Sequence, residues 1–364
     1  MTDTLVLEAD RLFTPAPAEP PLLAVRDGRV VAAGGAARGT GPARRVHGTL
    51  APALVDIQVN GGAGVNLQEP APDLARLHGW LRRAGVLTYV PTLVSAPLPR
   101  MVELARGLAG ERDGVRGLAP HFEGPLLSPR RLGAHDRAAV AGARAGELLE
   151  ATANLASWVT LAPEREGALD IVASLVAGGV RVSAGHSDAT FEQARAAFDA
   201  GISMVTHLFN AMAPLHHREP GLAGAALDEG ATCWAGLIAD GEHVHPSMVR
   251  TALEVLGERA ILVSDAAPAA GDTGGAAPRL GDGTLAGAGV ALDQCLRNVI
   301  AWGLPPERAL HAATAAPAGA LGIADRGRLA PELPALVALF DSDWRVLDAG
   351  PAEVVGGLIA GVAS

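Results

Sequence analysis

Lysine is absent from this 364-residue sequence, and all 29 basic residues other than histidine are arginine. The absence rules out a Schiff-base lysine, a nucleotide-binding P-loop lysine and a carbamylated lysine that bridges two metal ions. Composition alone therefore excludes three common catalytic designs.

Basic residues are also fewer than acidic ones, because 39 acidic residues against 29 arginines give the chain a net charge of −10 at pH 7. A protein that binds nucleic acid or an anionic membrane surface needs a basic patch to do so. We therefore expect neither nucleic acid nor a membrane among its partners.

Cysteine is scarce, with Cys233 and Cys295 lying far apart in the sequence. Neither stands in a spacing typical of a metal site, and the apolar context of each predicts a packing role. In a reducing cytosol both side chains would remain thiols.

Long apolar stretches and targeting signals are missing as well. The N-terminus has no basic segment followed by an apolar one, so no signal peptide is visible. The longest apolar tail, residues 354–363, is too short and too rich in glycine to span a bilayer. We expect a soluble cytoplasmic protein.

The sequence does contain a regular alternation of short apolar runs and longer intervals rich in Ala, Leu, Arg and Glu. The runs follow one another at the spacing of strands in a TIM (β/α)8 barrel, which predicts an α/β fold. The chain length favours one large domain and one small one. The eight expected barrel strands are residues 54–62, 86–93, 115–120, 158–162, 179–185, 204–208, 233–238 and 260–263.

The two ends of the chain predict the smaller domain. Asp27-Gly28 joins two apolar runs within residues 22–34, and this dipeptide is a strong hairpin signal. A hairpin needs further strands to be stable. Candidates for them are residues 4–9, 335–340 and 344–347. We expect a small β domain of residues 1–50 and 325–364 around a large domain of residues 51–324.

Polar side chains stand where four of the apolar runs end. His186 and His207 are separated by about twenty residues, an interval that suits one strand–loop–helix–strand unit. Both would then lie at the carboxyl ends of neighbouring parallel strands, where barrel and open α/β enzymes keep their chemistry. The four groups are, in chain order, Glu123 with His135, His186, His207 and Asp265.

One carboxylate and two imidazoles are a common ligand set for a catalytic divalent metal ion. Such an ion polarises a carbonyl and acidifies water, and a separate carboxylate then accepts the proton, a role for which Asp265 is a candidate. Each residue also has an ordinary interpretation, since a lone histidine is commonly a core or surface residue and Glu123 or Asp265 can cap a helix. The order acid, His, His, Asp favours the metal site, but spacing alone leaves both interpretations open.

Two loops indicate anion binding. Residues 214–221 contain Arg218, which suits bidentate contacts with phosphate or is simply a solvated side chain. Residues 239–246 contain His243 after the seventh run, where TIM barrels often bind phosphate. Residues 281–287 are rich in turn-forming residues and predict a hairpin or a loop that presents backbone groups to a substrate.

Six motifs occur in a distinctive order across the chain. They are His-Phe-Glu-Gly-Pro (121–125) followed by Gly-Ala-His (133–135), Ala-Gly-His-Ser-Asp-Ala-Thr (184–190), Thr-His-Leu-Phe-Asn-Ala-Met (206–212), His-Arg-Glu-Pro-Gly (217–221), Ala-Asp-Gly-Glu-His (239–243) and Val-Ser-Asp-Ala (263–266). Together they resemble the N-acetylglucosamine-6-phosphate deacetylases, a family of the amidohydrolase superfamily. The resemblance covers essentially the whole chain.

The resemblance implies a TIM barrel with a small β-sandwich domain built from both termini. It implies hydrolysis of the acetamide of N-acetylglucosamine-6-phosphate to glucosamine-6-phosphate and acetate. It also implies one divalent ion per subunit, with Zn²⁺ first and Fe²⁺, Co²⁺ or Mn²⁺ acceptable to the same ligands. Family members are usually homodimers, in which the partner subunit can contribute to the phosphate site.

Residue roles follow from the resemblance at matching positions. Glu123, His186 and His207 would hold the metal ion. Asp265 would serve as general base and then as general acid, and His135 would help to polarise the acetyl carbonyl. The residues that would bind the sugar phosphate are Ala134, Asn210, Ala211, Arg218, His243, Leu285, Ala286 and Gly287.

The chain departs from the wider superfamily at the end of the first expected barrel strand. Many amidohydrolases carry His-x-His there for a second metal ion, whereas this chain has Gln58-Val59-Asn60. Amides compete poorly with imidazole for a transition metal, so a mononuclear site is expected. Residues 331–337 also depart from the family pattern, which affects only the details of the small domain.

Other functions remain open from the sequence. The sibling substrate N-acetylgalactosamine-6-phosphate differs in the orientation of one hydroxyl, and nothing in the sequence separates the two sugars. Two histidines and a carboxylate also describe non-haem iron oxygenases, although Asp265 supplies the base that hydrolysis needs. A non-catalytic sugar-phosphate binding protein would be expected to lose Asp265 or a metal ligand, and all four residues are present.

Overall fold

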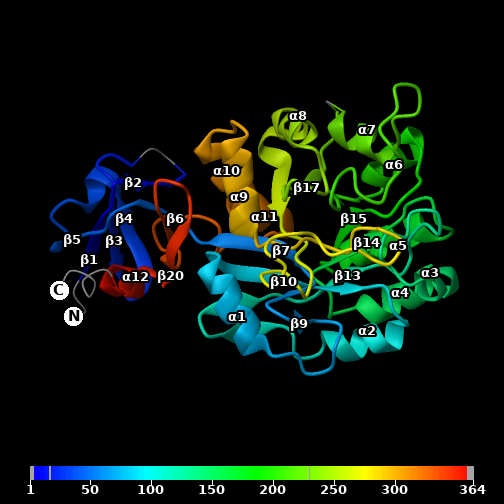
Figure 1. The fold of residues 1–364 in the computed structure, drawn as a ribbon, viewed down its shortest axis with the longest axis horizontal. Helices are drawn as coiled ribbons and strands as arrows, with labels where there is room; N and C mark the ends of the chain where they lie inside the picture. The colour runs from blue at the N-terminus through cyan, green and yellow to red at the C-terminus, as the bar shows by residue number, and fades with distance from the viewer. Residues whose placement is uncertain (1–3, 16–17, 229, 359–364) are drawn as a thin grey trace.

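A computed structural model describes residues 4–15, 18–228 and 230–358 of the chain (Figure 1). The structure is mixed α/β, as the alternation of apolar runs predicts. Blue N-terminal and red C-terminal segments lie side by side at one end of the molecule, and the remaining helices and strands form the larger part (Figure 1). Within the described ranges no helix is long and apolar enough to cross a membrane.

The larger part is built on eight parallel strands that pair in chain order. They are β7 (Leu54–Val59), β10 (Val86–Val94), β13 (His121–Glu123), β14 (Trp158–Leu161), β15 (Arg181–Ala184), β16 (Met204–Val205), β17 (Trp234–Ile238) and β18 (Ala260–Val263). The helices are α1 (Leu74–Arg83), α2 (Leu98–Ala105), α3 (Arg137–Gly142), α4 (Ala145–Thr152), α5 (Ala168–Ala177), α6 (Phe191–Asp199), α7 (Gly221–Leu227), α8 (Pro246–Leu256), α9 (Leu292–Ala301), α10 (Pro306–Ala313) and α11 (Ala315–Leu321).

The first and last of these strands meet at their carboxyl ends. The backbone N–H of Asp265 donates to the carbonyl of Gln58 at 3.0 Å, and the N–H of Asn60 donates to the carbonyl of Ala266 at 2.9 Å. Val59 and Ala266 also form a parallel bridge. Residues from opposite ends of the sheet are thereby brought together.

Both faces of the strands are buried, which explains why the runs are apolar throughout rather than alternating. In β18, Ile261 and Val263 join one core cluster, while Ala260 and Leu262 join the larger cluster that includes the helices. Cys233 belongs to that larger cluster, as does Cys295, and both are buried and free, as the packing interpretation expects.

Three of the eight expected barrel strands end three residues away from the expected position, while the other bounds of the eight agree to within two residues. The third was expected to end at Pro120, but it consists of β12 (Val115–Gly117) and, beyond the proline, β13. Proline has no N–H to donate to the sheet, so pairing stops there and then resumes. Glu123 therefore lies within a strand. The sixth strand ends at Val205 instead of Leu208, and the first ends at Val59, with Gly61–Gly62 forming β8 against β9 (Val65–Asn66).

The smaller part consists of two four-stranded sheets with the orders β4-β3-β1-β5 and β2-β6-β19-β20. Its strands are β1 (Leu5–Glu8), β2 (Arg11–Leu12), β3 (Leu22–Arg26), β4 (Arg29–Ala33), β5 (Ala43–Arg45), β6 (Thr49–Pro52), β19 (Leu336–Phe340) and β20 (Val346–Pro351), followed by α12 (Ala352–Leu358). The expected hairpin is the β3–β4 pair. Asp27 and Gly28 both have positive φ there, as a tight hairpin turn requires.

A core shared by the two small sheets joins the chain ends. Leu7 and Leu23 from one sheet and Leu50 and Leu339 from the other are fully buried in a single cluster. The remaining short elements are the strand β11 (Gly110–Arg112), which pairs with β12, and two 3-10 helices at Gly34–Ala37 and Gly257–Arg259.

Candidate metal centre and substrate cavity

The four polar groups singled out from the sequence gather at one end of the parallel sheet. Glu123 is the last residue of β13, and His186, His207 and Asp265 each lie two residues beyond β15, β16 and β18. Since the carboxyl ends of parallel strands meet at one edge, the topology alone brings these side chains to one place.

The backbone turns sharply at three of these positions. The φ angles of His186, His207 and Asp265 are 47°, 29° and 51°, in the left-handed region that residues other than glycine rarely adopt. Such conformations persist only where surrounding contacts hold them, and they concentrate at functional sites. Each turn redirects the chain from its strand so that the side chain faces the strand ends.

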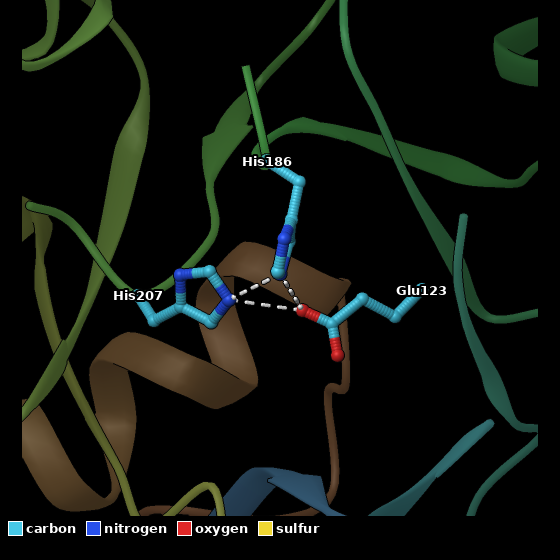
Figure 2. Close-up of side chains that lie close together, drawn as sticks. All are labelled: Glu123, His186 and His207. Carbon is cyan, nitrogen blue, oxygen red and sulfur yellow. Dashed lines mark hydrogen bonds and ion pairs between the residues drawn. The ribbon is translucent and has the colours of Figure 1, made fainter. Parts of the chain in front are cut away.

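Glu123, His186 and His207 present three donor atoms to a common point (Figure 2). Nε2 of His186 lies 3.0 Å from Nε2 of His207 and 3.3 Å from Oε1 of Glu123, and Nε2 of His207 lies 3.0 Å from the same oxygen. Ligand atoms about 2.0–2.1 Å from a tetrahedral zinc ion are separated by about 3.3 Å. The spacing therefore fits a single divalent ion.

The second ring nitrogen of His186 supports the same interpretation. Nδ1 of His186 donates to the backbone carbonyl of Arg131 at 2.9 Å, so its Nε2 carries the lone pair that a metal requires. Nδ1 of His207 is buried without a hydrogen-bond partner among the described residues. The tautomer assignment toward a metal ion therefore rests on His186.

Charge interactions dominate the protonation of the ligands. Burial acts to raise the pKa of Glu123, but its interactions with His186 and His207 hold it well below its usual range. Burial acts to lower the pKa of His207, and the Glu123 carboxylate overcomes this and raises it. Glu123 is therefore a carboxylate, the form that binds a cation.

His135 stands beside the cluster as a neutral imidazole. Burial lowers its pKa to about 3, and the charge of His186 contributes. Its Nδ1 accepts a hydrogen bond from the backbone N–H of Ser95 at 3.1 Å. The proton of the neutral ring is then on Nε2, which lies 3.9 Å from Oε2 of Glu123. His135 is thus a hydrogen-bond donor toward the space in front of Glu123.

Asp265 is buried and is held by an amide. Burial raises its pKa to about 6, and the negative charge of Glu123 adds to the rise. Nδ2 of Asn60 donates to its Oδ1 at 2.8 Å. A carboxyl group with a pKa in this range can both accept and return a proton near neutral pH.

A cavity of about 560 Å³ opens in front of these residues. It is lined by Glu123, His186, His207, Asp265 and His135. Most of the positions expected to bind substrate also line it, namely Ala134, Asn210, Ala211, His243, Leu285, Ala286 and Gly287. Its volume suits a small ligand of the size of a sugar phosphate.

Arg218 is the one expected site residue that lies outside this lining. It is exposed, and its guanidinium contacts Nε2 of His217 at 2.8 Å. His243, in contrast, is fixed in the cavity wall by Asp240, whose Oδ2 lies 2.7 Å from Nδ1 of the ring. With the ring proton on Nδ1, Nε2 of His243 can accept a hydrogen bond from a ligand.

Several residues of the cavity were not identified from the sequence. The sequence marks Asn60 only as a replacement for a metal ligand, yet in the structure it contacts Asp265. Gln68 ties the loop after β9 to the carboxyl end of β10 through Thr92 and Val94. Further lining residues are Asn66, Gly133, Ile238, Ala267, Pro268, Leu280 and Thr284. Gly133 stands in the Gly-Ala-His motif and Thr284 in the turn-rich loop of residues 281–287, whereas no local pattern marks the others.

Two curated relatives resemble the chain over most of its length. An N-acetylgalactosamine-6-phosphate deacetylase of Escherichia coli O157:H7 is 37% identical over 320 residues, covering 82% of this chain and 85% of the relative. An N-acetylglucosamine-6-phosphate deacetylase of Mus musculus is 36% identical over 310 residues, covering 75% of each. A comparison with protein-family models finds no match.

A solved structure extends the likeness to three dimensions. It is an aspartate-to-alanine variant of the N-acetyl-D-glucosamine-6-phosphate deacetylase of Mycobacterium smegmatis in complex with N-acetyl-D-glucosamine-6-phosphate. It superposes with a TM-score of 0.86 at 34% identity, covering 95% of this chain and 97% of that one.

The fold, the ligand cluster and these relatives define a metal-dependent hydrolase of the amidohydrolase superfamily. Within that class, the chain belongs to the N-acetylglucosamine-6-phosphate deacetylase family.

Proposed function

We propose that this protein removes the acetyl group of N-acetylglucosamine-6-phosphate, yielding glucosamine-6-phosphate and acetate. The observation that carries the proposal is the meeting of Glu123, His186 and His207 with Asp265 and His135 in one cavity. Membership of the deacetylase family supplies the substrate class.

The metal site proposed here is held by Glu123, His186 and His207. A divalent ion held there would polarise the acetyl carbonyl and lower the pKa of water. Gln58 and Asn60 stand where a second ion would need ligands, and each turns its amide nitrogen toward a carboxylate: Nε2 of Gln58 donates to Glu123 and Nδ2 of Asn60 donates to Asp265. Amides also compete poorly with imidazole for a transition metal. We therefore propose one ion per subunit, with Zn²⁺ the first candidate.

Asp265 and His135 carry the proton and the hydrogen bond in this proposal. The Asp265 carboxylate takes a proton from water as the water oxygen bonds to the acetyl carbon. It then returns the proton to the nitrogen as the carbon–nitrogen bond breaks, so acetate and a free amine result. The Nε2–H of His135 donates to the acetyl oxygen as negative charge develops on it.

The remaining expected residues are proposed to hold the sugar phosphate. His243 presents an acceptor nitrogen to a sugar hydroxyl, and Asn210 and Ala211 line the cavity from the loop after β16. Leu285 to Gly287 form the apolar wall of the cavity. Arg218 is exposed on its own subunit, which suits a phosphate site completed in a homodimer.

The same proposal includes the architecture and setting of the enzyme. The hydrogen bonds that join the ends of β7 and β18 support a closed (β/α)8 barrel of residues 51–324. The two sheets with a common core support a β-sandwich of residues 1–50 and 325–364. A homodimer in the cytoplasm is what the family resemblance leads us to expect.

A second candidate substrate is N-acetylgalactosamine-6-phosphate. The relative with 37% identity is a deacetylase of that sugar, and it shares more of its length with this chain than the mouse enzyme does. The chemistry at the metal would be unchanged, because the two sugars differ in one hydroxyl away from the acetamide.

Acetate release tests the proposal directly. Enzyme stripped by a chelator, and the same enzyme after addition of Zn²⁺, are each given N-acetylglucosamine-6-phosphate, N-acetylgalactosamine-6-phosphate and unphosphorylated N-acetylglucosamine. We expect metal-dependent release from the first and little from the last. A preference for the galacto sugar would keep the mechanism and change the substrate. Absence of release from all three, with metal bound, would refute the function.

A further inference from the structure

The loop after β14 contributes no residue to the cavity, yet its carboxylate Glu164 holds the chain beside a proposed metal ligand. Oε1 of Glu164 accepts a hydrogen bond from the backbone N–H of Asp188 at 2.6 Å. Oε2 accepts another from Oγ of Ser187 at 2.7 Å. These two partners directly follow His186, so one side chain clamps the backbone on the C-terminal side of that histidine.

A second set of contacts holds His186 from the opposite side. The backbone carbonyl of Arg131 accepts the hydrogen bond from Nδ1 of His186, and the N–H of Ser128 donates to the carbonyl of His186 at 2.9 Å. The guanidinium of Arg131 pairs with Oδ1 of Asp188 at 2.7 Å. This ion pair links the segment that orients the imidazole ring to the segment that Glu164 clamps.

His186 needs such support because its backbone adopts a left-handed conformation, with a φ angle of 47°. A residue with a Cβ atom leaves that region unless its neighbours prevent it. The following residue, Ser187, is fully buried, and its Oγ also accepts a hydrogen bond from the N–H of Ala189. Several hydrogen bonds therefore hold the turn. Removing one of these hydrogen bonds would let the backbone of His186 leave the left-handed region and would move Nε2 away from Glu123 and His207.

We propose that Glu164 and the Arg131–Asp188 ion pair are positioning residues that hold His186 in place and thereby set the affinity for the metal ion. The inference rests on the proposed metal site but not on the identity of the sugar. Contacts behind a histidine ligand typically change metal affinity by about 10- to 100-fold when they are removed.

The first test compares Glu164→Ala with Glu166→Ala. Glu166 is an exposed acid two positions away in the same loop, so it controls for the loss of a negative charge there. The dissociation constant for Zn²⁺ is measured by competition with a chromophoric chelator. Glu164→Ala should raise it about 10- to 100-fold, whereas Glu166→Ala should leave it within about twofold of the parent. Glu164→Gln, which keeps two polar atoms in place, should restore most of the affinity.

The second test uses two arginines that contact the same carboxylate. Arg131 and Arg130 both pair with Asp188, but the Arg131 side chain is 29% exposed and that of Arg130 is 78% exposed. Exposed pairs contribute little, and only the side chain of Arg131 anchors a residue whose backbone carbonyl accepts the hydrogen bond from His186. Arg131→Ala should therefore weaken Zn²⁺ binding about tenfold or more, and Arg130→Ala should not. This comparison also decides the matter if Glu164→Ala does not fold.

A spectroscopic readout separates positioning from general destabilisation. Each variant is saturated with Co²⁺, whose visible absorption reports the coordination geometry of the ion. We expect an altered spectrum for Glu164→Ala and Arg131→Ala and the parental spectrum for both controls. Parental affinity and spectrum in both test variants would overturn the inference. A parent enzyme that binds Zn²⁺ but releases no acetate would refute the proposed function alone, while one that binds no divalent ion would refute both.

Discussion

Replacement of Asp265 by asparagine isolates its proton-transfer role, because the two side chains have the same shape. Nδ2 of Asn60 can still donate to the remaining carbonyl oxygen at position 265, so the φ angle of 51° and the orientation of the side chain should persist. The substitution also removes a buried charge, so the melting temperature should not fall. Only the ability to accept and return a proton is lost.

The expected loss of turnover is large. Burial raises the pKa of Asp265 to about 6, so an assay at about pH 8 lies roughly two units higher and about 99% of the groups are carboxylates. General acid–base catalysis contributes about 10²- to 10⁴-fold, equivalent to roughly 3–5 kcal/mol of barrier. We expect kcat to fall by this factor, with the metal content of the variant unchanged.

Steady-state acetate release, read together with metal analysis of the same preparation, measures both quantities. The exposed Asp272 provides a matched control, since Asp272→Asn makes the same change outside the cavity lining. In the parent, kcat should decline about tenfold per pH unit below the pKa of Asp265, which is about 6. A cation bound nearby would lower this pKa and move the decline to lower pH. An Asp265→Asn enzyme with one ion per subunit and more than about a tenth of parental turnover would remove this residue from the mechanism.

Four further outcomes are expected. Metal analysis should find about one divalent ion per subunit, as a single ligand set implies, and a second tightly held ion would contradict the role given to the two amides. Arg218→Ala should mainly raise KM for the phosphorylated sugar; an unchanged KM would place the phosphate elsewhere. Gly287→Ala should impair turnover more than Gly283→Ala, since both positions have positive φ but only at Gly287 would the new Cβ lie 2.8 Å from a backbone oxygen, that of Asp265. Equal activities of the two variants would show that the loop shifts to accommodate the added methyl group, contrary to this prediction. Burial raises the pKa of Asp56 to about 7, so its contribution to the free energy of unfolding is full below about pH 4 and is lost as the pH rises through about 7. The free energy of unfolding of Asp56→Asn, measured with a chemical denaturant, should lack this pH dependence. Parallel dependence of the two free energies on pH in parent and variant would contradict the assignment.

Much of the fold follows from local sequence patterns. Apolar runs such as Ile261 to Val263 predict buried strands wherever both faces of a sheet are covered, and Asp27-Gly28 predicts a tight hairpin. The polar residue after each run is visible for the same reason. His186, His207 and Asp265 could therefore be selected as candidates, because parallel strands must end on the same side.

Contacts between segments that are distant in the sequence cannot be predicted from local patterns. The hydrogen bond from Asn60 to Asp265 exists only because the first and last strands of the sheet meet, which no local window of sequence contains. Glu164 looks like an ordinary loop acid until the structure sets it against Ser187 and Asp188. The left-handed turns cannot be predicted from the sequence either, since the preference of histidine and aspartate for positive φ is too weak to identify them.

The pairing of β6 with β19 has a consequence for how the chain folds. Thr49 pairs with Phe340, about 290 positions later, and the fully buried Leu50 depends on the same cluster as Leu339. At a synthesis rate of about 5–20 residues per second, the early strands emerge from the ribosome about 15–60 s before their partner exists. During that interval the edge of β6 and its apolar side chains are exposed to other chains. Newly made protein should therefore depend on chaperones until its last strand arrives.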